Sequence, residues 1–98
     1  MIPLLSTIIL TASWYGDYFH GRTAANGSIY NMNASTAAHK TLPFGTKLEV
    51  CYEGCEVVTI TDRGPFIPGR HLDLSKGTAR RIGMLNTGVA PVTVKRLN

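Results

Sequence analysis

Residues 57–75 (VVTITDRGPFIPGRHLDLS) constrain the fold more than any other stretch, because two strand patterns there are joined by two turn signals. Apolar and polar residues alternate up to Asp62, which is the period of a β-strand. The pairs Gly64-Pro65 and Pro68-Gly69 are typical of turns, and a second apolar run follows at Leu72–Leu74. The stretch therefore predicts a strand, a loop of about nine residues and another strand.

Each of these two strands carries a carboxylate. Asp62 ends the first strand, on the same side of the alternation as Val58 and Ile60, and Asp73 lies in the second strand. We expect the two aspartates to meet across a cleft, where paired carboxyl groups take on different pKa values and perform acid-base chemistry. The alternative is that each aspartate only accepts hydrogen bonds from the turn beside it.

The length and composition predict one mainly β domain. A chain of 98 residues supports a single core. Ten glycines, five prolines and many Thr, Val and Ile residues in short runs indicate strands joined by turns, with little helix.

The formal charge of +4 suits an acidic or polyanionic partner such as bacterial cell wall or nucleic acid, or simply a soluble surface. Nucleic acid is disfavoured, because only Arg80-Arg81 and Lys95-Arg96 are adjacent basic pairs and no aromatic residues alternate with them. No cluster of residues has metal-ligand spacing, so we expect neither a metal nor a cofactor.

The two cysteines, Cys51 and Cys55, enclose residues 52–54 (YEG). Two thiolates are too few for a zinc site unless a histidine joins them. We expect a disulfide across the tip of a hairpin, since Gly54 permits the turn and neighbouring strands can be bridged. A disulfide favours an oxidising compartment.

Residues 1–11 are apolar but too few to span a bilayer as a helix. They are either the remnant of a secretory signal or a leading strand. A charged segment before the apolar run is missing, and Leu10 is a poor residue three positions before a cut at Ala12. We place the domain at residues 12–98, with a first strand in residues 12–16 (ASWYG).

The remaining segments alternate between loops and short elements. Residues 17–33 lack a sustained period and predict a long surface loop, after which Asn33 is expected to cap a short helical turn at residues 36–38. The other predicted elements are a hairpin of residues 46–50 and 56–62, a helix at residues 76–82 capped by Ser75 and stopped at Gly83, and a last strand at residues 90–97.

Many short motifs, in order over about 85 of the 98 residues, resemble the rare lipoprotein A (RlpA) domain. They are ASWYG (12–16), TAANG (23–27), MN (32–33), TAAH (36–39), LPFGT (42–46), TDRGPF (61–66), GR (69–70), LDLS (72–75), GM (83–84) and APV (90–92). The resemblance implies a six-stranded double-psi β-barrel, similar in fold to expansins and family 45 endoglucanases. It also implies a lytic transglycosylase that cuts peptidoglycan glycan strands, preferably those without stem peptides.

The resemblance also assigns roles to individual residues. Asp73 matches the position of the catalytic acid, Asp62 matches an aspartate needed for activity, and His39 matches an active-site position, although a lone histidine is more often a hydrogen-bonded structural residue. One departure is Ser28, which stands where active members commonly have a glutamate.

The mechanistic hypothesis makes Asp73 the proton shuttle and Asp62 the neighbour that tunes it, with exchanged roles as the alternative. We expect Arg63 either to bind glycan or to form an ion pair with Asp62. We expect Tyr15, Tyr18 and Phe66 either to stack on sugar rings or to belong to the core. The expected substrate-binding residues are Tyr15, Thr61, Arg63, Phe66 and Arg70.

Two functions stay open at this level. The first is an endolytic lytic transglycosylase, and the second is a non-catalytic, expansin-like module that binds glycan or loosens the wall. Both imply peptidoglycan glycan strands as the partner, no membrane span and an extracytoplasmic location in the periplasm, the wall, the medium or a phage. We expect a monomer.

Overall fold

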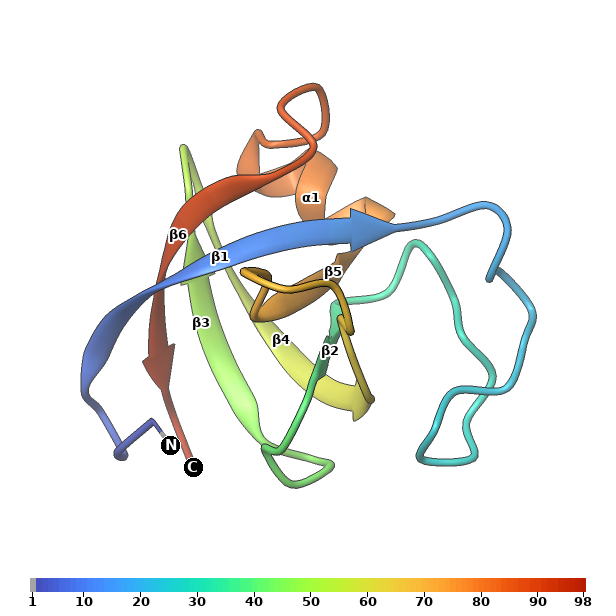
Figure 1. The fold of residues 1–98 in the computed structure, drawn as a ribbon, viewed down its shortest axis with the longest axis horizontal. Coiled ribbons are helices and arrows are strands. Elements are labelled where there is room, and N and C mark those ends of the chain that lie inside the picture. The colour runs from blue at the N-terminus through green and yellow to red at the C-terminus, as the bar shows by residue number, and fades with distance from the viewer. Residues whose placement is uncertain (1) are drawn as a thin grey trace.

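The computed structural model describes residues 2–98, which form a closed β-barrel with one short helix outside it (Figure 1). Six strands and one helix follow each other along the chain: β1 (Thr7–Tyr15), β2 (Thr36–His39), β3 (Lys47–Cys51), β4 (Cys55–Asp62), β5 (Leu72–Ser75), α1 (Lys76–Ile82) and β6 (Ala90–Arg96). The prediction of a mainly β, six-stranded barrel with one short helix is confirmed.

The strands close in the order β1-β5-β2-β4-β3-β6, which differs from their order in the chain. Two neighbouring pairs, β1 with β5 and β2 with β4, are parallel, and the other four pairs are antiparallel. As a result, the short strand β2 lies between the two strands that carry the aspartates.

The core fills the interior of the barrel with aliphatic side chains. Alternation in β3, β4 and β6 turns every second residue inward, as strand geometry requires. The largest fully buried side chains are Leu42, Leu48, Val50, Val58, Ile60, Leu72, Leu74, Thr78, Ile82, Met84, Val92 and Val94.

The predicted helix is present with the predicted ends. Ser75 Oγ accepts a hydrogen bond from the Thr78 N–H, which makes Ser75 the N-cap. Gly83 ends the helix with φ of 92°, a left-handed conformation that favours glycine. The N–H groups of Glu53 and Gly54, at the tip of the β3–β4 hairpin, both donate to the Ile82 carbonyl oxygen and so tie the hairpin to the helix.

Two predicted elements differ from the structure. The helical turn predicted after Asn33 is wrong, because Thr36–His39 forms strand β2. Hydrogen bonding to β4 on one side and to β5 on the other overrides the local signal of a capping residue. The first strand begins at Thr7 rather than Ala12, since residues 7–12 pair with β6.

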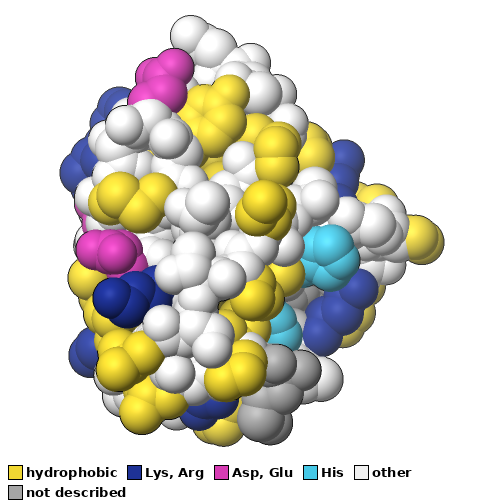
Figure 2. Space-filling view, turned by 90° about the vertical axis from the view of Figure 1, so that its left-hand side faces the viewer, with side chains coloured by type: hydrophobic (Ala, Val, Ile, Leu, Met, Phe, Trp, Pro, Cys, Tyr) yellow, Lys and Arg dark blue, Asp and Glu magenta, His cyan; other side chains and the backbone are white. Residues whose placement is uncertain are grey.

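The outer face formed by the first half of β1, β6 and β3 carries hydrophobic side chains with basic side chains among them (Figure 2). Ile9, which is 71% exposed, and Tyr52 line a shallow depression there. Within residues 2–98, no helix is long and apolar enough to cross a membrane.

Candidate active site

Four residues on adjacent strands form a row across the barrel. Ser13 of β1 pairs with Asp73 of β5, Asp73 pairs with Ala38 of β2, and Ala38 pairs with Asp62 of β4. Because neighbouring strands lie about 4.8 Å apart, the Cα atoms of the two aspartates are roughly 10 Å apart. The small side chain of Ala38 leaves the space between the two carboxylates open.

An irregularity in the pairing of β2 with β4 puts Asp62 in this row. Ala37 pairs with Ile60, whereas the next residue, Ala38, pairs with Asp62, so Thr61 is the extra residue of a β-bulge. Ile60 points into the core, and regular alternation would turn Asp62 inward as well. The bulge instead re-aims the Asp62 side chain to the face of Asp73, a use of bulges that is common beside active sites.

The row lies in an open cleft of about 440 Å³. The prediction that Asp62 shares a side with Val58 and Ile60 is therefore wrong, since only Asp62 reaches this cleft. The lining comprises Ser13, Trp14, Tyr15, Phe19, Ala38, Asp62, Arg63, Gly64, Pro65, Phe66, Ile67, Arg70 and Asp73.

Asp73 is a half-buried carboxyl group with one internal hydrogen bond, from Ser13 Oγ to its Oδ1 atom at 3.0 Å. Burial raises the pKa of Asp73 to about 6, and the charge of Asp62 adds to the rise, while Ser13 and Arg70 oppose it. A carboxyl group with a pKa raised to about 6 keeps its proton in a larger fraction of molecules near neutral pH than an ordinary aspartate does, which suits a general acid.

Asp62 is held by the backbone. Its Oδ1 atom accepts hydrogen bonds from the N–H groups of Ala25 and Arg63, each at 2.9 Å. Both interpretations of Asp62 therefore apply, because it accepts hydrogen bonds from its own turn and also lines the cleft. The contact with Ala25 fixes the loop before β2 against the end of β4.

Arg63 and Arg70 both line the cleft, with different surroundings. Within residues 2–98, Arg63 forms no ion pair with the Asp62 carboxylate, although its Nη1 atom donates to the Asp62 backbone carbonyl at 3.4 Å. It also donates to the Leu42 carbonyl at 2.9 Å and lies over the Phe44 ring at 3.9 Å from its centroid, which fixes the turn after β2. Arg70 acts on the site through its charge, which lowers the pKa of Asp73 against the effect of burial.

His39 and Thr61 do not line the cleft. His39 Nδ1 accepts hydrogen bonds from the N–H groups of Thr41 at 3.1 Å and Leu42 at 3.0 Å, so the ring stabilises the turn after β2. Burial, together with the charge of Arg63, lowers the pKa of His39 and keeps this nitrogen free to accept. His39 Nδ1 is thus used by the turn beside the site, and a catalytic role of the ring stays a prediction.

Of the three aromatic residues expected to stack on sugars, Tyr15 and Phe66 line the cleft and Tyr18 does not. Phe66 is 78% exposed, in the loop that joins β4 to β5, and can contact a bound chain. Tyr15 has one face covered by Tyr30, with ring centroids 4.5 Å apart and planes 19° from parallel. Stacking on a sugar therefore suits Phe66 better than Tyr15.

Ser13 and Ala38 line the candidate site, and sequence reasoning missed both. Ser13 is a small polar residue between the buried Ala12 and the aromatic Trp14, so the alternation of the ASWYG strand already separated it from the core. For Ala38 the sequence carried no such signal, since its importance comes from strand neighbours on both sides.

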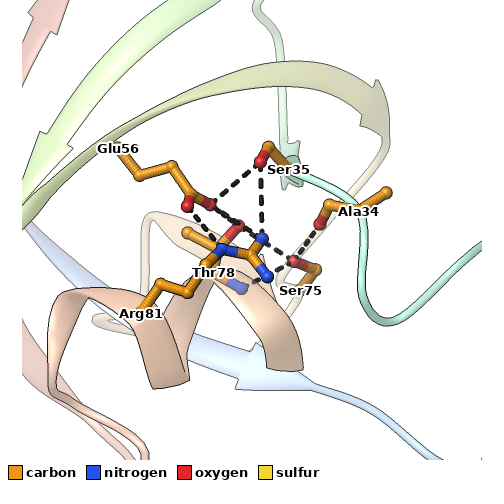
Figure 3. Close-up of polar contacts among 6 residues, drawn as sticks. All are labelled: Ala34, Ser35, Glu56, Ser75, Thr78 and Arg81. Atoms are coloured by element: carbon orange, nitrogen blue, oxygen red, sulfur yellow. Dashed lines mark hydrogen bonds and ion pairs between the residues drawn. The ribbon is translucent and has the colours of Figure 1, made fainter.

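A polar network on the far end of β4 joins the elements that carry the aspartates (Figure 3). Glu56 Oε2 accepts hydrogen bonds from Ser35 Oγ, Thr78 Oγ1 and Arg81 Nη2. Ser75 Oγ donates to the Ala34 carbonyl. The network thereby binds β4, the start of α1 and the segment before β2 into one unit.

The cysteines lie where the hairpin prediction put them. Cys51 and Cys55 form a disulfide with Cα atoms 4.0 Å apart, closing the turn between β3 and β4. This turn is the one that contacts the end of α1 through Glu53 and Gly54.

Comparison with known families and proteins agrees with this site. Residues 7–94 match the family model described as Lytic transglycolase. The chain is 56% identical over 86 residues to the probable endolytic peptidoglycan transglycosylase RlpA of Synechocystis sp., covering 85% of this chain and 27% of that protein. It is 51% identical to the endolytic peptidoglycan transglycosylase RlpA of Campylobacter jejuni, covering 86% of this chain and 32% of that protein.

Solved structures give the same fold. The Streptomyces papain inhibitor superposes with a TM-score of 0.78 at 24% identity, covering 100% of both chains, which indicates the fold alone. The expansin of Clavibacter michiganensis superposes with a TM-score of 0.73 at 26% identity, covering 95% of this chain and 51% of the expansin. The chain therefore belongs to the RlpA family of lytic transglycolase domains and has their double-psi β-barrel fold.

Proposed function

We propose that this domain is an endolytic peptidoglycan lytic transglycosylase that cleaves MurNAc-GlcNAc strands and leaves 1,6-anhydro-muramyl ends. The observation that carries the proposal is the placement of Asp62 and Asp73 in one open cleft, on either side of Ala38. The names of relatives that are 56% and 51% identical to this chain over the aligned residues support the same activity, although the chain spans only 27% and 32% of their length.

The reaction needs one group that first gives a proton and then takes one back. Asp73 in its protonated form, which the raised pKa favours, donates its proton to the glycosidic oxygen as the bond from C1 of MurNAc to that oxygen breaks. The 6-hydroxyl of the same MurNAc then bonds to C1 and gives its proton to the Asp73 carboxylate. Bonds and protons balance, and no water is consumed.

Asp62 has a different task from Asp73. Two N–H donors hold its Oδ1 atom, so the carboxylate keeps a fixed position across the cleft. From there its charge stabilises the positive, oxocarbenium-like sugar that forms as the bond breaks. The same charge raises the pKa of Asp73 further and keeps the acid protonated.

The walls of the cleft suit a long sugar chain without stem peptides. Phe66 and Ile67, both exposed, form one wall, and Phe19 contributes an apolar surface as well. Arg63 and Arg70 supply donors for sugar hydroxyl groups or for the lactyl carboxylate of MurNAc. We therefore infer peptide-free glycan strands as the preferred substrate, and a monomer as the working form.

The location follows from the substrate. A wall-cleaving enzyme acts outside the cytoplasm, and the disulfide between Cys51 and Cys55 suits an oxidising compartment. Whether the domain works in the periplasm, in the wall or as part of a phage is a separate question for localisation experiments.

A second candidate is a glycan-binding module that does not turn over its substrate. The likeness to an expansin favours it, since one solved structure holds an expansin mutant in complex with cellohexaose. Ser28 also replaces the glutamate common in active members. Ser28 does not line the cleft, and its hydroxyl group donates a hydrogen bond to Asn26 Oδ1. The Ser28 hydroxyl therefore does not take the place of a third carboxylate beside Asp62 and Asp73.

The decisive experiment incubates the purified chain with intact and with peptide-stripped sacculi and analyses the soluble fraction by mass spectrometry. The transglycosylase proposal predicts 1,6-anhydro-muramyl products, with more from the stripped sacculi. Binding to sacculi without such products, in conditions where a known transglycosylase releases them, would reject the proposal and favour the binding module.

A further inference from the structure

The hydroxyl group of Tyr15 is a buried polar group that the mechanism above does not use. Tyr15 is the last residue of β1, and its side chain lines the cleft. Within residues 2–98, its Oη atom is shielded from solvent and has no hydrogen-bond partner. Buried hydroxyl groups are nearly always paired, so an unpaired one beside a reactive cleft calls for a functional reason.

The tyrosine ring is held firmly in its position. Tyr30 stacks on one face at 4.5 Å, and Phe19 meets the ring edge-on with centroids 5.6 Å apart. The Tyr30 hydroxyl donates to the Tyr15 carbonyl oxygen at 2.7 Å. Of the two stacked tyrosines, Tyr30 uses its hydroxyl group in a hydrogen bond within the protein, whereas the Tyr15 hydroxyl group has no partner within residues 2–98.

In each of the two carboxylates of the cleft, Asp62 and Asp73, one oxygen atom accepts hydrogen bonds from the protein. Asp62 and Asp73 accept their protein hydrogen bonds on Oδ1, and within residues 2–98 neither Oδ2 atom accepts one. Burial, followed by the charges of Asp62 and Asp73, raises the pKa of Tyr15, so the hydroxyl keeps its proton and remains a donor. One spare donor therefore belongs to the same cleft as two spare acceptor oxygens.

We propose that Tyr15 is a positioning residue for the carboxylate pair: with a glycan in the cleft, its hydroxyl donates a hydrogen bond to Asp62 and keeps that carboxylate ionised while Asp73 holds the proton. A hydrogen bond donated to a carboxylate favours its ionised form. Asp73 already has Ser13 as its donor, whereas Asp62 has only backbone donors. A glycan excludes water from the cleft and strengthens the pairing.

The other charged and titratable groups around Asp62 and Asp73 do not favour ionisation of one aspartate over the other. Arg63 and Arg70, from the loop between β4 and β5, both line the cleft, and either charge favours ionisation of a nearby carboxyl group. Tyr30 is neutral and its hydroxyl is already bonded. Tyr15 is thus the group that can separate the protonation states of the two aspartates. This inference rests on the proposed function.

The test compares Tyr15→Phe with its matched control Tyr30→Phe, since each removes one hydroxyl and keeps the ring stack. For Tyr15→Phe we expect an unchanged or higher Tm, a kcat lowered about tenfold, an unchanged KM, and an acidic limb of the pH profile moved toward neutral by about 0.5–1 pH unit. For Tyr30→Phe we expect a Tm lowered by about 4–8 °C and an acidic limb at the wild-type pH.

An acidic limb of Tyr15→Phe that coincides with the wild-type limb overturns the inference, whatever happens to kcat. If the wild type releases no anhydro products, the proposed function fails, and carboxyl ¹³C NMR then tests Tyr15 by itself. With peptide-free glycan strands bound, the Asp62 carboxyl resonance should titrate at higher pH in Tyr15→Phe than in the wild type. Equal midpoints would overturn the inference.

Discussion

Asp62 and Asp73 flank the same residue, Ala38, from opposite sides of strand β2. The chain brings them together through strand pairing, although eleven positions and an irregular loop separate them in sequence. A four-residue strand thereby sets the spacing of the carboxylates, and the bulge at Thr61 sets their common direction. The predictions below follow from this arrangement.

Removing the donor to Asp73 should move the pH dependence of the reaction. Ser13→Ala deletes the hydrogen bond that favours the ionised carboxylate, so the pKa of Asp73 should rise above about 6 by roughly one unit. The basic limb of the kcat profile should therefore move to higher pH by the same amount. A profile measured on peptide-free strands checks this, and an unmoved or lowered basic limb would show that Ser13 does not tune Asp73.

The opening between the aspartates should not tolerate a larger side chain. Ala38→Val adds two methyl groups to the cleft floor, so activity should fall at least tenfold. Because β-branched residues suit a strand, the free energy of unfolding should change by less than about 1 kcal/mol. Its control is Ala37→Val, one residue away and facing the core, which should lower the free energy of unfolding by about 1–3 kcal/mol. Urea unfolding and product assays on both variants separate the effects, and an active Ala38→Val would contradict the placement.

The network around Glu56 should stabilise the fold in a pH-dependent manner. Burial acts to raise the pKa of Glu56, but hydrogen bonds from Arg81, Thr78 and Ser35 outweigh it and lower the pKa. Since the folded pKa is the lower one, this stabilisation is present above about pH 4.3 and is lost as the pH falls. Glu56→Gln should cost about 1–2 kcal/mol at pH 7 and less at pH 3.

The control for this variant is Glu49→Gln, on β3. Within residues 2–98, Glu49 forms no side-chain hydrogen bond or ion pair, so its replacement should change the unfolding free energy by less than about 0.5 kcal/mol. Unfolding curves at both pH values check the pair. A loss for Glu56→Gln that is equal at pH 3 and pH 7 would mean that charge plays no part.

The buried acid should reduce stability at neutral pH. Because the pKa of Asp73 is raised from its ordinary value to about 6, its contribution to stability is complete below about pH 4 and is lost as the pH rises through 6. Asp73→Asn should therefore match the wild type at pH 4 and exceed it by about 1–3 kcal/mol at pH 7.5. Thermal unfolding followed by circular dichroism at the two pH values measures this, and a variant less stable than the wild type at pH 7.5 would contradict it.

Local patterns predicted the elements that carry their own signals. The hairpin of β3 and β4 followed from alternation around a tight turn, and α1 followed from Ser75 and Gly83 at its ends. Strand β2 was missed because four residues, two of them alanine, have no period to detect, and only pairing with β4 and β5 makes them a strand. The first half of β1 fits the leading-strand alternative for residues 1–11, and its pairing with β6 could not be seen in the local pattern.

The site was predicted in part. Asp62 and Asp73 meet in a cleft as expected, yet simple alternation turned Asp62 toward the core, because a bulge in one strand depends on the strand beside it. His39 was expected in the site, and its catalytic role stays a prediction. No motif revealed that its Nδ1 atom accepts hydrogen bonds from Thr41 and Leu42.

The central claim is that Asp73 is the proton shuttle of a lytic transglycosylase. The most direct measurement is mass spectrometry of peptide-free glycan strands incubated with wild type and with Asp73→Asn, both verified as folded by circular dichroism. We predict 1,6-anhydro-muramyl ends from the wild type and a rate at least 100-fold lower from the variant. Anhydro ends formed at the wild-type rate by Asp73→Asn, or reducing ends in place of anhydro ends from the wild type, would contradict the account.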